Sequence, residues 1–420
     1  MDREKVTQVS TSFGFTIILT KSGKVYSMGT NINGQLGLGF KKSRIISPCL
    51  IDPKWFDYDK VIEISTGICN SLALTQNGNV YIWGHYQKLA IDMFGDDHCF
   101  PKKINSNRFS NQKIKHISCG SLVSCYFLVT ENNEVYSCGF NENFQLGLGG
   151  ILAAMYPSLI DSSSYNNEKI KKIKCVKYHT CLLTENGKVY TCGANFHCQL
   201  GIDIVSDNVS FTFRLVTNND NDFSKEKIID IESGSFHSIC LSETGKIYTW
   251  GENDSGECGL NDIGISKKVP HLIDPKYFYN EKIIAIGCGK LSSLALSASG
   301  KIYFWGLMDQ NKLPLMGKPN IFKNLSNEDC VICPSQVENV FLKGEKVIAL
   351  NANKCCFNVS FTITKTGKLF MQGDNSQGQL GLSNCENRNS LVRCNSSVFG
   401  KDSNDKMYKN LSFGDIVIEF

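Results

Sequence analysis

One phrase recurs seven times along this chain and constrains its fold more than any other feature. Each copy is a short apolar run that ends in glycine, such as "GKVYSMG", "GKVYTCG" or "GKIYTWG", and most copies continue into a stretch like "NINGQLGLG". The closing glycines follow one another at intervals of 55, 55, 54, 58, 55 and 67 residues: Gly29, Gly84, Gly139, Gly193, Gly251, Gly306 and Gly373. A nearly fixed period of this length indicates a repeat architecture, in which each unit packs against its neighbours.

Each repeat has the pattern of four β-strands. Upstream of the glycine-terminated phrase lie a short strand, a tight turn and an alternating strand, as in "ISTGICNSLALT" (Ile64–Thr75). A hairpin turn such as Asn77-Gly78 follows, because glycine supplies the positive φ that such turns need. The variable segment after the glycine-rich stretch holds the fourth strand, as in "SPCLID" (Ser47–Asp52). The sequence therefore predicts an all-β fold, a seven-bladed β-propeller of four-stranded antiparallel blades, formed as a single domain over residues 1–420.

The glycine-rich stretch has a structural explanation. We predict that Gly34, Gly37 and Gly39 let the chain bend where a Cβ would clash with the next blade. Leu36 and Leu38 would then fill the wedge between two blades. On this interpretation the repeated phrase serves the blade interfaces and binds no ligand.

Bulk composition is that of an ordinary folded protein. Hydrophobic residues make up 42% of the 420 residues and charged residues 20%, and the net charge of +4 is small for this mass. Such a charge indicates neither a nucleic-acid nor a membrane partner. We find no signal peptide and no apolar stretch of membrane-spanning length, so we expect an intracellular monomer in the cytoplasm or nucleus.

The 19 cysteines do not read as a disulfide framework. Many of them fall inside predicted strands, where a free thiol behaves as a small buried hydrophobe, and a reducing compartment would keep them reduced. Cys330 and Cys333 form one CxxC pair, with Cys355 and Cys356 following in the sequence. A zinc site would need four converging ligands, and a single CxxC is weak evidence for one, so we expect no metal.

Two segments depart from the repeat. The 67-residue interval places an insertion at about residues 307–345, which we expect to project from one face of the propeller. The last residues, "KNLSFGDIVIEF" (409–420), begin another copy of the first-strand phrase. We predict that this segment pairs with the N-terminal residues 6–19 and closes the ring, which would remove an exposed strand edge. The competing explanation is that the chain is a piece of a longer product with more repeats.

The combined pattern "SxGxxHSxxLxxxGKVYxWGxNxxGQLGLG" strongly resembles that of the regulator of chromosome condensation family. Both halves recur in register over residues 5–420. The resemblance implies a seven-bladed propeller. It also implies one of three roles: guanine-nucleotide exchange on the small GTPase Ran, chromatin binding, or an interaction module in ubiquitin ligases and other assemblies.

The resemblance places the GTPase-binding face at the turns of the "SxGxxHS" phrase, where the exchange factor carries acidic residues and a histidine. Here the corresponding turns keep the histidine only at His179 and His237, and none of the seven contains Asp or Glu. Each histidine could hold its turn against the next blade or contact a partner directly. The candidate partner-binding residues are Asn70, Tyr178, His179, Phe236 and His237.

The stretch "EKIKKIKCVKYH" (Glu168–His179) is rich in lysine. It is explained either by a solvated edge strand, where lysine discourages sheet-to-sheet pairing, or by an anionic partner such as DNA phosphate. No triad, P-loop or paired carboxylates stand in a recognisable frame, so we assign no catalytic residues and no cofactor.

Together these features predict an intracellular interaction propeller that binds a protein partner on one face. The alternative is an exchange factor for a Ran-type small GTPase, with chromatin as a further partner. The absence of acidic residues from the aligned turns favours the first interpretation.

Overall fold

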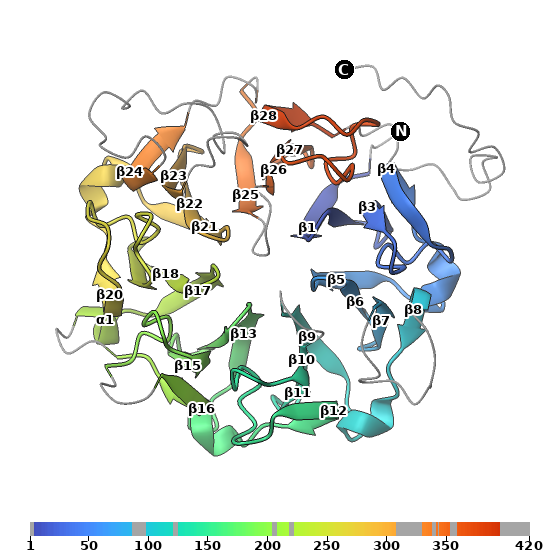
Figure 1. The fold of residues 1–420 in the computed structure, drawn as a ribbon, viewed down its shortest axis with the longest axis horizontal. Coiled ribbons are helices and arrows are strands. Elements are labelled where there is room, and N and C mark those ends of the chain that lie inside the picture. Colours follow the sequence, from blue (N-terminus) through green and yellow to red (C-terminus); the bar gives the residue numbers. More distant parts are fainter. Residues whose placement is uncertain are drawn as a thin grey trace.

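The computed structural model describes residues 4–85, 98–120, 125–203, 208–217, 222–307, 330–337, 342, 344–352 and 359–394. These residues form seven antiparallel sheets arranged as a ring (Figure 1). The first strands of several blades line an open space at the centre of the ring, which we call the central channel. Each sheet has four strands that follow one another in the sequence. The predicted seven-bladed propeller is confirmed.

The blades are numbered in chain order. The first four consist of these strands: β1 (Val6–Ser12), β2 (Phe15–Thr20), β3 (Val25–Asn31) and β4 (Lys42–Leu50); β5 (Val61–Thr66), β6 (Asn70–Thr75), β7 (Val80–Gly84) and β8 (His98–Lys103); β9 (Ile114–Cys119), β10 (Tyr126–Thr130), β11 (Val135–Phe140) and β12 (Ala153–Leu159); β13 (Ile170–Cys175), β14 (His179–Thr184), β15 (Val189–Ala194) and β16 (Val209–Leu215). The last three consist of these: β17 (Ile228–Ser233), β18 (His237–Ser242), β19 (Ile247–Gly251) and β20 (Lys267–Leu272); β21 (Ile283–Cys288), β22 (Ser292–Ser297), β23 (Ile302–Leu307) and β24 (Cys330–Val337); β25 (Val347–Ala352), β26 (Val359–Thr364), β27 (Leu369–Gly373) and β28 (Arg388–Arg393).

Burial within a blade explains its sequence pattern. The first strand of each blade lies nearest the channel and the fourth lies outermost (Figure 1). The second strands β2, β6, β14, β18, β22 and β26 are buried at every position. Both of their faces are covered because each sheet is packed between two neighbouring blades, which is why these strands read as nearly continuous apolar runs with small hydroxyl residues.

The glycine-rich loops run against the next blade as predicted, with one exception. At Gly34 (φ +73°) a Cβ would lie 2.7 Å from the Cα of Cys99, and at Gly37 (φ +70°) it would lie 2.8 Å from Nε1 of Trp83. Leu36 is fully buried between blades 1 and 2, and Leu38 packs partly buried against the same cluster. Gly39 was expected to avoid a clash, but a Cβ there would meet nothing within 4 Å, so its glycine serves the positive φ of +85° alone.

Each of these loops is also hydrogen-bonded to the next blade. The carbonyl of Gln35 in blade 1 accepts from Ser71 Oγ (3.0 Å) and from Trp83 Nε1 (2.9 Å) in blade 2. The carbonyl of Gln199 accepts in the same way from Ser238 Oγ (3.3 Å) and Trp250 Nε1 (2.9 Å). A repeated pair of buried hydrogen bonds therefore fixes one blade against the next.

Short helices wedge between blades on the outside of the ring. They are the 3-10 helices η1 (Pro53–Phe56), η2 (Ser106–Phe109), η3 (Ser162–Tyr165) and η4 (Pro275–Phe278) and the helix α1 (Asp222–Lys225). Each one buries a single aromatic residue. Phe278, for example, packs edge-on against Tyr303 and Trp305 of the following blade. This connector was not identified from the sequence.

Blade 1 packs directly against blade 7 and closes the ring. The N–H of Val6 donates to the carbonyl of Gly367 (3.2 Å), and Thr16 Oγ1 donates to the carbonyl of Gln379 (2.8 Å). One apolar cluster contains side chains of both blades, among them Ile18, Tyr26, Phe361 and Met371. The segment 409–420 lies outside the described residues, so its pairing with the N-terminus stays a prediction.

The remaining expectations concern the insertion and the cysteines. The range 307–345 contains β24, the fourth strand of blade 6, and residues 308–329 within it lie outside the described part of the chain. The described cysteines are free thiols, and most of them are buried. Cys355 and Cys356 are outside the described residues. In the part of the chain that the structure describes, no helix is long and apolar enough to cross a membrane.

Candidate functional site

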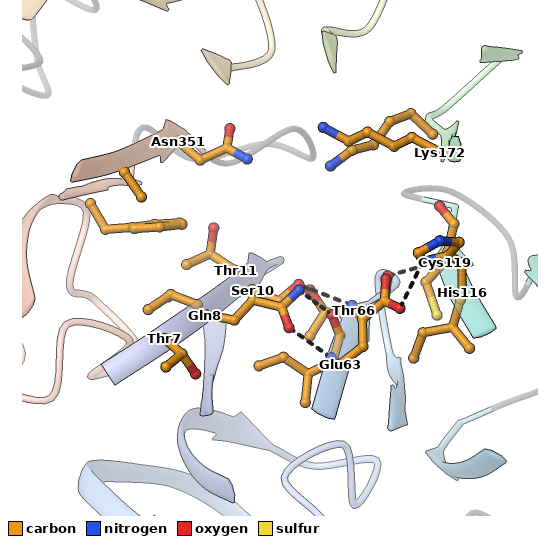
Figure 2. Close-up of a pocket in the computed structure, with 18 of the residues that line it drawn as sticks. Thr7, Gln8, Ser10, Thr11, Glu63, Thr66, His116, Cys119, Lys172 and Asn351 are labelled. Atoms are coloured by element: carbon orange, nitrogen blue, oxygen red, sulfur yellow. Dashed lines mark hydrogen bonds and ion pairs between the residues drawn. The ribbon is translucent and has the colours of Figure 1, made fainter. Parts of the chain in front are cut away.

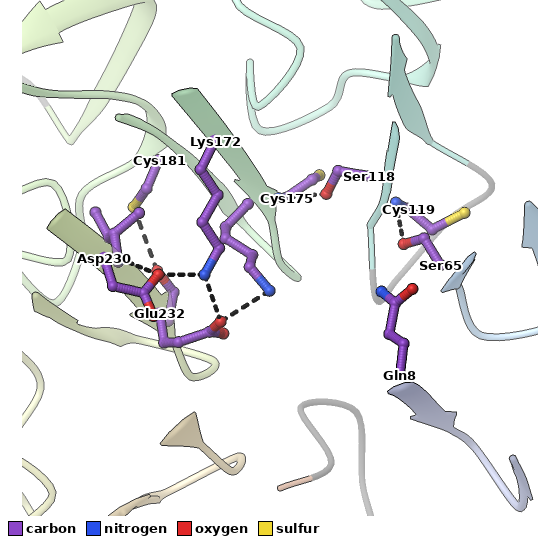
Figure 3. A network of polar contacts seen from close by, with 12 residues as sticks. Gln8, Ser65, Ser118, Cys119, Lys172, Cys175, Cys181, Asp230 and Glu232 are labelled. Carbon is purple, nitrogen blue, oxygen red and sulfur yellow. Dashed lines mark hydrogen bonds and ion pairs between the residues drawn. The ribbon is translucent and has the colours of Figure 1, made fainter. Parts of the chain in front are cut away.

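The lysine-rich strand β13 faces the central channel. Lys172 forms ion pairs with Asp230 and with Glu232 (3.0 Å) on β17 of the next blade, and Lys174 lies 2.8 Å from the same Glu232 carboxylate (Figure 3). Lys171 Nζ donates to the carbonyl of Ile229 (2.8 Å). β13 is an edge strand, as the solvated-strand interpretation requires. Its lysines, however, bind residues of strand β17 in blade 5.

This network sets the charge state of its members. Burial by itself would lower the pKa of Lys172, but Asp230 and Glu232 outweigh that effect and raise the pKa above its ordinary value. The lysine therefore stays charged over the whole physiological range, and much of its charge is neutralised inside the channel. Lys171, Lys172 and Lys174 are therefore bound to groups of blade 5 and are not free cations for an anionic partner.

A polar cavity of about 330 Å³ occupies the channel beside this network (Figure 2). Across from the lysines, Gln8 bonds both the N–H and the carbonyl of Ile64 at 2.9 Å. Ser10 and Thr66 pair through their hydroxyls at 2.8 Å. These contacts join blade 1 to blade 2, so the polar wall of the cavity is also part of the blade interfaces.

The two candidate histidines are enclosed between blades. His179 and His237 have no exposed surface. His179 Nε2 lies 2.9 Å from Ser238 Oγ of blade 5, and His237 Nε2 lies 2.9 Å from Ser293 Oγ of blade 6. Burial lowers the pKa of His237 to about 4, so its ring is neutral at physiological pH. This geometry supports the interpretation in which each histidine holds its turn against the next blade.

Asn70 occupies the corresponding position of blade 2. It pairs with Gly84 as His179 pairs with Gly193 and His237 with Gly251. The Asn70 side chain is buried, and the structure does not bring it to the blades that carry the two histidines.

The other two candidates, Tyr178 and Phe236, are half-buried and stack on each other. Their ring centroids are 4.9 Å apart and their planes differ by 14°. Each residue immediately precedes a buried histidine, Tyr178 in the turn of blade 4 and Phe236 in the turn of blade 5. Lys177 Nζ lies 4.6 Å from the Tyr178 ring centroid, a cation–π distance.

The stack continues into the glycine-rich loop of blade 4. The His197 ring lies 4.5 Å from that of Phe236, and His197 Nδ1 lies 3.1 Å from Glu252 Oε1 at the end of β19. Phe196 beside it is 60% exposed. We call the set Lys177, Tyr178, Phe196, His197, Phe236 and Glu252 the aromatic face.

Sequence reasoning missed His197, Phe196 and Glu252. The available signal was a departure from the repeat, because "NFHCQLG" puts two aromatic rings where blade 1 has "NINGQLG". Loop positions next to a repeated glycine-rich phrase are where a repeat protein varies its surface without disturbing its interfaces.

Metal binding has no support in the part of the chain that can be described. No three His, Cys, Asp or Glu side chains converge as a metal site would require among those residues. The features that the structure does define are a ring of interlocked blades, a polar channel and an aromatic face. They define the class of the protein as a repeat-built β-propeller with a surface of loop and turn side chains.

The comparisons with known proteins place the chain within that class. The model of the RCC1-like domain family matches residues 1–289, and the chain belongs to this family. The ultraviolet-B receptor UVR8 of Arabidopsis thaliana is 28% identical over 388 residues, which cover 92% of this chain and 80% of UVR8. The human E3 ubiquitin-protein ligase HERC2 is 28% identical over 328 residues, 76% of this chain but only 6% of that ligase.

Solved structures agree on the fold. Human WBSCR16 superposes with a TM-score of 0.74 at 17% identity, covering 89% of this chain and 94% of the other. Prp20p from Saccharomyces cerevisiae, whose structure was reported with its binding properties to Gsp1p and histones, gives a TM-score of 0.72 at 21% identity. That match covers 90% of this chain and 87% of Prp20p. At these identities the likeness concerns the fold alone.

Proposed function

We propose that this chain is a protein-interaction propeller that binds a protein partner through the aromatic face on blades 4 and 5. The observation that carries the proposal is the Tyr178–Phe236 stack, in which two half-buried rings from different blades meet at 4.9 Å. Aromatic residues are enriched at the centres of protein interfaces. Rings that are already held in place lose little conformational entropy when a partner binds.

The surroundings of the stack support this role. Tyr178 and Phe236 are each followed by a histidine that is hydrogen-bonded to the next blade, and these bonds hold the two turns in place. Lys177 and Glu252 at the two ends provide charges that can orient a partner. Free thiols at the described cysteines suit a reducing compartment, and we extend the proposal to an intracellular protein.

The alternative is guanine-nucleotide exchange on a Ran-type GTPase, with chromatin as a further partner. Prp20p, studied for its binding to Gsp1p and histones, is a reason to test it. Two observations weigh against it here. The aligned turns contain no carboxylate, and both histidines are enclosed, so neither can reach the phosphate and magnesium region of a bound nucleotide.

Affinity capture from the native cell tests the proposal. The tagged wild-type chain is compared with Tyr178→Ala and Phe236→Ala, and with Ile32→Ala as a matched control. Ile32 is 62% exposed in the corresponding loop of blade 1, so it removes an exposed apolar side chain far from the aromatic face. We expect a partner that the wild type and Ile32→Ala retain and that Phe236→Ala weakens by about tenfold or more.

The aromatic face is not the binding surface if the Tyr178→Ala, Phe236→Ala double variant retains every captured protein as well as the wild type does. Thermal melts must show that this variant is folded.

A further inference from the structure

Glu257 stands where four other blades carry glutamine. The equivalent residues are Gln35, Gln145, Gln199 and Gln379. Each of these accepts, through Oε1, a hydrogen bond from the backbone N–H two residues earlier, at 2.9–3.0 Å. Glu257 makes the same bond through Oε2, which accepts from the N–H of Ser255 at 2.7 Å. The carboxyl group therefore occupies the same position as the amides.

The second side-chain atom is where the blades differ. In blades 3 and 7 the amide Nε2 donates to a group five residues earlier: Gln145 to the carbonyl of Phe140 and Gln379 to the carboxylate of Asp374, both at 3.0 Å. In blade 5 that atom is Oε1 of Glu257, an acceptor. It is buried and has no hydrogen-bond donor among the described residues.

At the position that Asp374 occupies in blade 7, blade 5 carries another carboxyl group, that of Glu252. Glu252, five residues earlier, is within side-chain hydrogen-bonding reach of Glu257. Two carboxylates are both acceptors, so they bond only when one of them carries a proton and donates it to the other. Burial raises the pKa of Glu257 to about 7, and burial also raises the pKa of Glu252.

The polar and charged groups around the pair come from three blades. His197 Nδ1 of blade 4 lies 3.1 Å from Glu252 Oε1. The positive charge of Lys290, in the turn of blade 6, acts to lower the pKa of Glu252. Asp254 adds a negative charge near both carboxyls. The backbone of Glu257 is fixed, because its carbonyl accepts from Ser293 Oγ (3.1 Å) and Trp305 Nε1 (2.9 Å). Movement on a change of charge is thus confined to the side chains.

We propose that Glu252 and Glu257 share one proton near neutral pH and that this proton couples the aromatic face to pH. While it is present, Glu257 donates to Glu252, and Glu252 is held beneath His197. When it is lost, two negative charges stand side by side in a buried space. Glu252 then moves toward His197 and Lys290, and the His197 ring, 4.5 Å from Phe236, moves with it. The face also becomes more negative by one charge.

The shared proton can be measured in the free protein, without any partner. Carboxyl resonances of 13C-labelled glutamate are followed from pH 4 to 9, and Glu257 is assigned by its absence from Glu257→Gln. Glutamine occupies this position in four other blades, so the variant is expected to fold, and a thermal melt checks it. Glu243→Gln is the matched control, because Glu243 is an exposed glutamate of the same blade.

We expect one carboxyl to titrate within about one unit of pH 7 in the wild type and in Glu243→Gln, and to be missing from Glu257→Gln. If no glutamate titrates above its ordinary range, the pair holds no proton and the proposal is wrong. Glu252→Gln provides a second route, since it removes the facing charge and returns the titration of Glu257 toward lower pH.

The coupling to the face is read from the His197 ring. With histidine labelled selectively, the chain gives seven ring signals, and His197→Gln identifies the one of interest. In the wild type this signal should change at the pH where the glutamate titrates, and in Glu257→Gln that change should vanish. If the His197 signal depends on pH in the same way in both proteins, the proton does not affect the aromatic face.

The consequence for binding rests on the proposed function and is tested separately. For a partner whose capture depends on Phe236, wild-type retention should differ between pH 6 and pH 8, by no more than tenfold per pH unit for one linked proton. Retention of the partner by Glu257→Gln should be the same at pH 6 and at pH 8. If Phe236→Ala leaves all capture unchanged, the proposed function fails while the titration of the free protein still stands or falls by itself.

Discussion

Tyr178 and Phe236 stack with their ring planes 14° apart, although 57 residues and a blade boundary separate them in the chain. Each is followed by a histidine that points into the structure and bonds a serine of the next blade. Because successive side chains alternate in direction at the start of a strand, one residue reaches the surface and the next one reaches the interface. The stacking of these two rings therefore depends on the relative orientation of blades 4 and 5.

This arrangement predicts an energetic coupling between the two rings. Tyr178→Ala and Phe236→Ala should each lower the free energy of unfolding modestly, since both rings are only half-buried. The double variant should lose less than the two single variants together, by about 0.5–1.5 kcal/mol, which is the usual worth of an aromatic pair beyond its buried area. Urea unfolding of the four proteins measures the difference. Strict additivity would mean that the contact contributes nothing.

Trp250 should stabilise the ring through its indole N–H as well as its bulk. The nitrogen donates to the carbonyl of Gln199 at 2.9 Å in a fully buried setting. Trp250→Phe keeps an aromatic ring but removes the donor, and Ser238 still donates to the same carbonyl. We expect a loss of about 1–3 kcal/mol in the free energy of unfolding. Trp55→Phe, at a half-buried tryptophan that stacks on Phe100, should cost clearly less.

The channel network should be more than a surface ion pair. Glu232 binds both Lys172 and Lys174 and is almost completely buried. Glu232→Gln removes the negative charge that pairs with Lys172 and Lys174, although Asp230 still pairs with Lys172. We expect a loss of about 1–3 kcal/mol, below the usual cost of breaking a fully buried pair. Glu243→Gln, which breaks the exposed Lys227 pair, should change stability by less than about 1 kcal/mol. Equal effects of the two variants would contradict a special role for the channel.

Much of the fold could be predicted because the repeat states the same constraint seven times. Glycine recurs at the position of Gly37 in five blades, and at each of these glycines a Cβ would collide with a side chain of the next blade, so the glycine pattern indicated where the blades meet. The pattern says nothing about which loops meet in space. Tyr178 and Phe236 were both candidates, but their stacking depends on the twist between two blades, and His197 joins them from a loop that was interpreted as scaffold.

Buried polar residues were the least predictable part. The sequence of β13 alone is explained either by a solvated strand or by binding of an external anion, because one strand does not show which strand lies beside it. Their partners, Asp230 and Glu232, lie about 60 residues later in the corresponding strand of blade 5. Comparing charge between equivalent strands of successive repeats would have found the match, since the first strands of adjacent blades face each other around the channel.

Ran provides the direct test of the alternative function. Release of a fluorescent guanine nucleotide from purified Ran is followed with and without this protein. We expect no acceleration, because the aligned turns offer no carboxylate and His237 has no exposed surface. An acceleration of about a hundredfold, equivalent to about 3 kcal/mol off the barrier, would establish exchange activity and overturn the proposed function. Phe236→Ala would then show whether the same face is used.

The burial of His237 predicts a pH dependence of stability with a definite sign. Its pKa falls to about 4 in the folded protein, against about 6.5 when unfolded, so between these values only the unfolded chain takes up the proton. The stability from neutral His237 is complete above about pH 6.5 and is lost as the pH falls toward 4.

Glu257 acts in the opposite direction, because its raised pKa makes the folded state gain stability as the pH falls from about 7. The wild-type profile therefore mixes the two, and the comparison must be with His237→Asn, since asparagine occupies this position in blade 2 as Asn70. Between pH 7 and pH 5 the wild type should lose about 2 kcal/mol more than His237→Asn in urea unfolding. Parallel profiles would mean that His237 is protonated without cost and is not enclosed in solution.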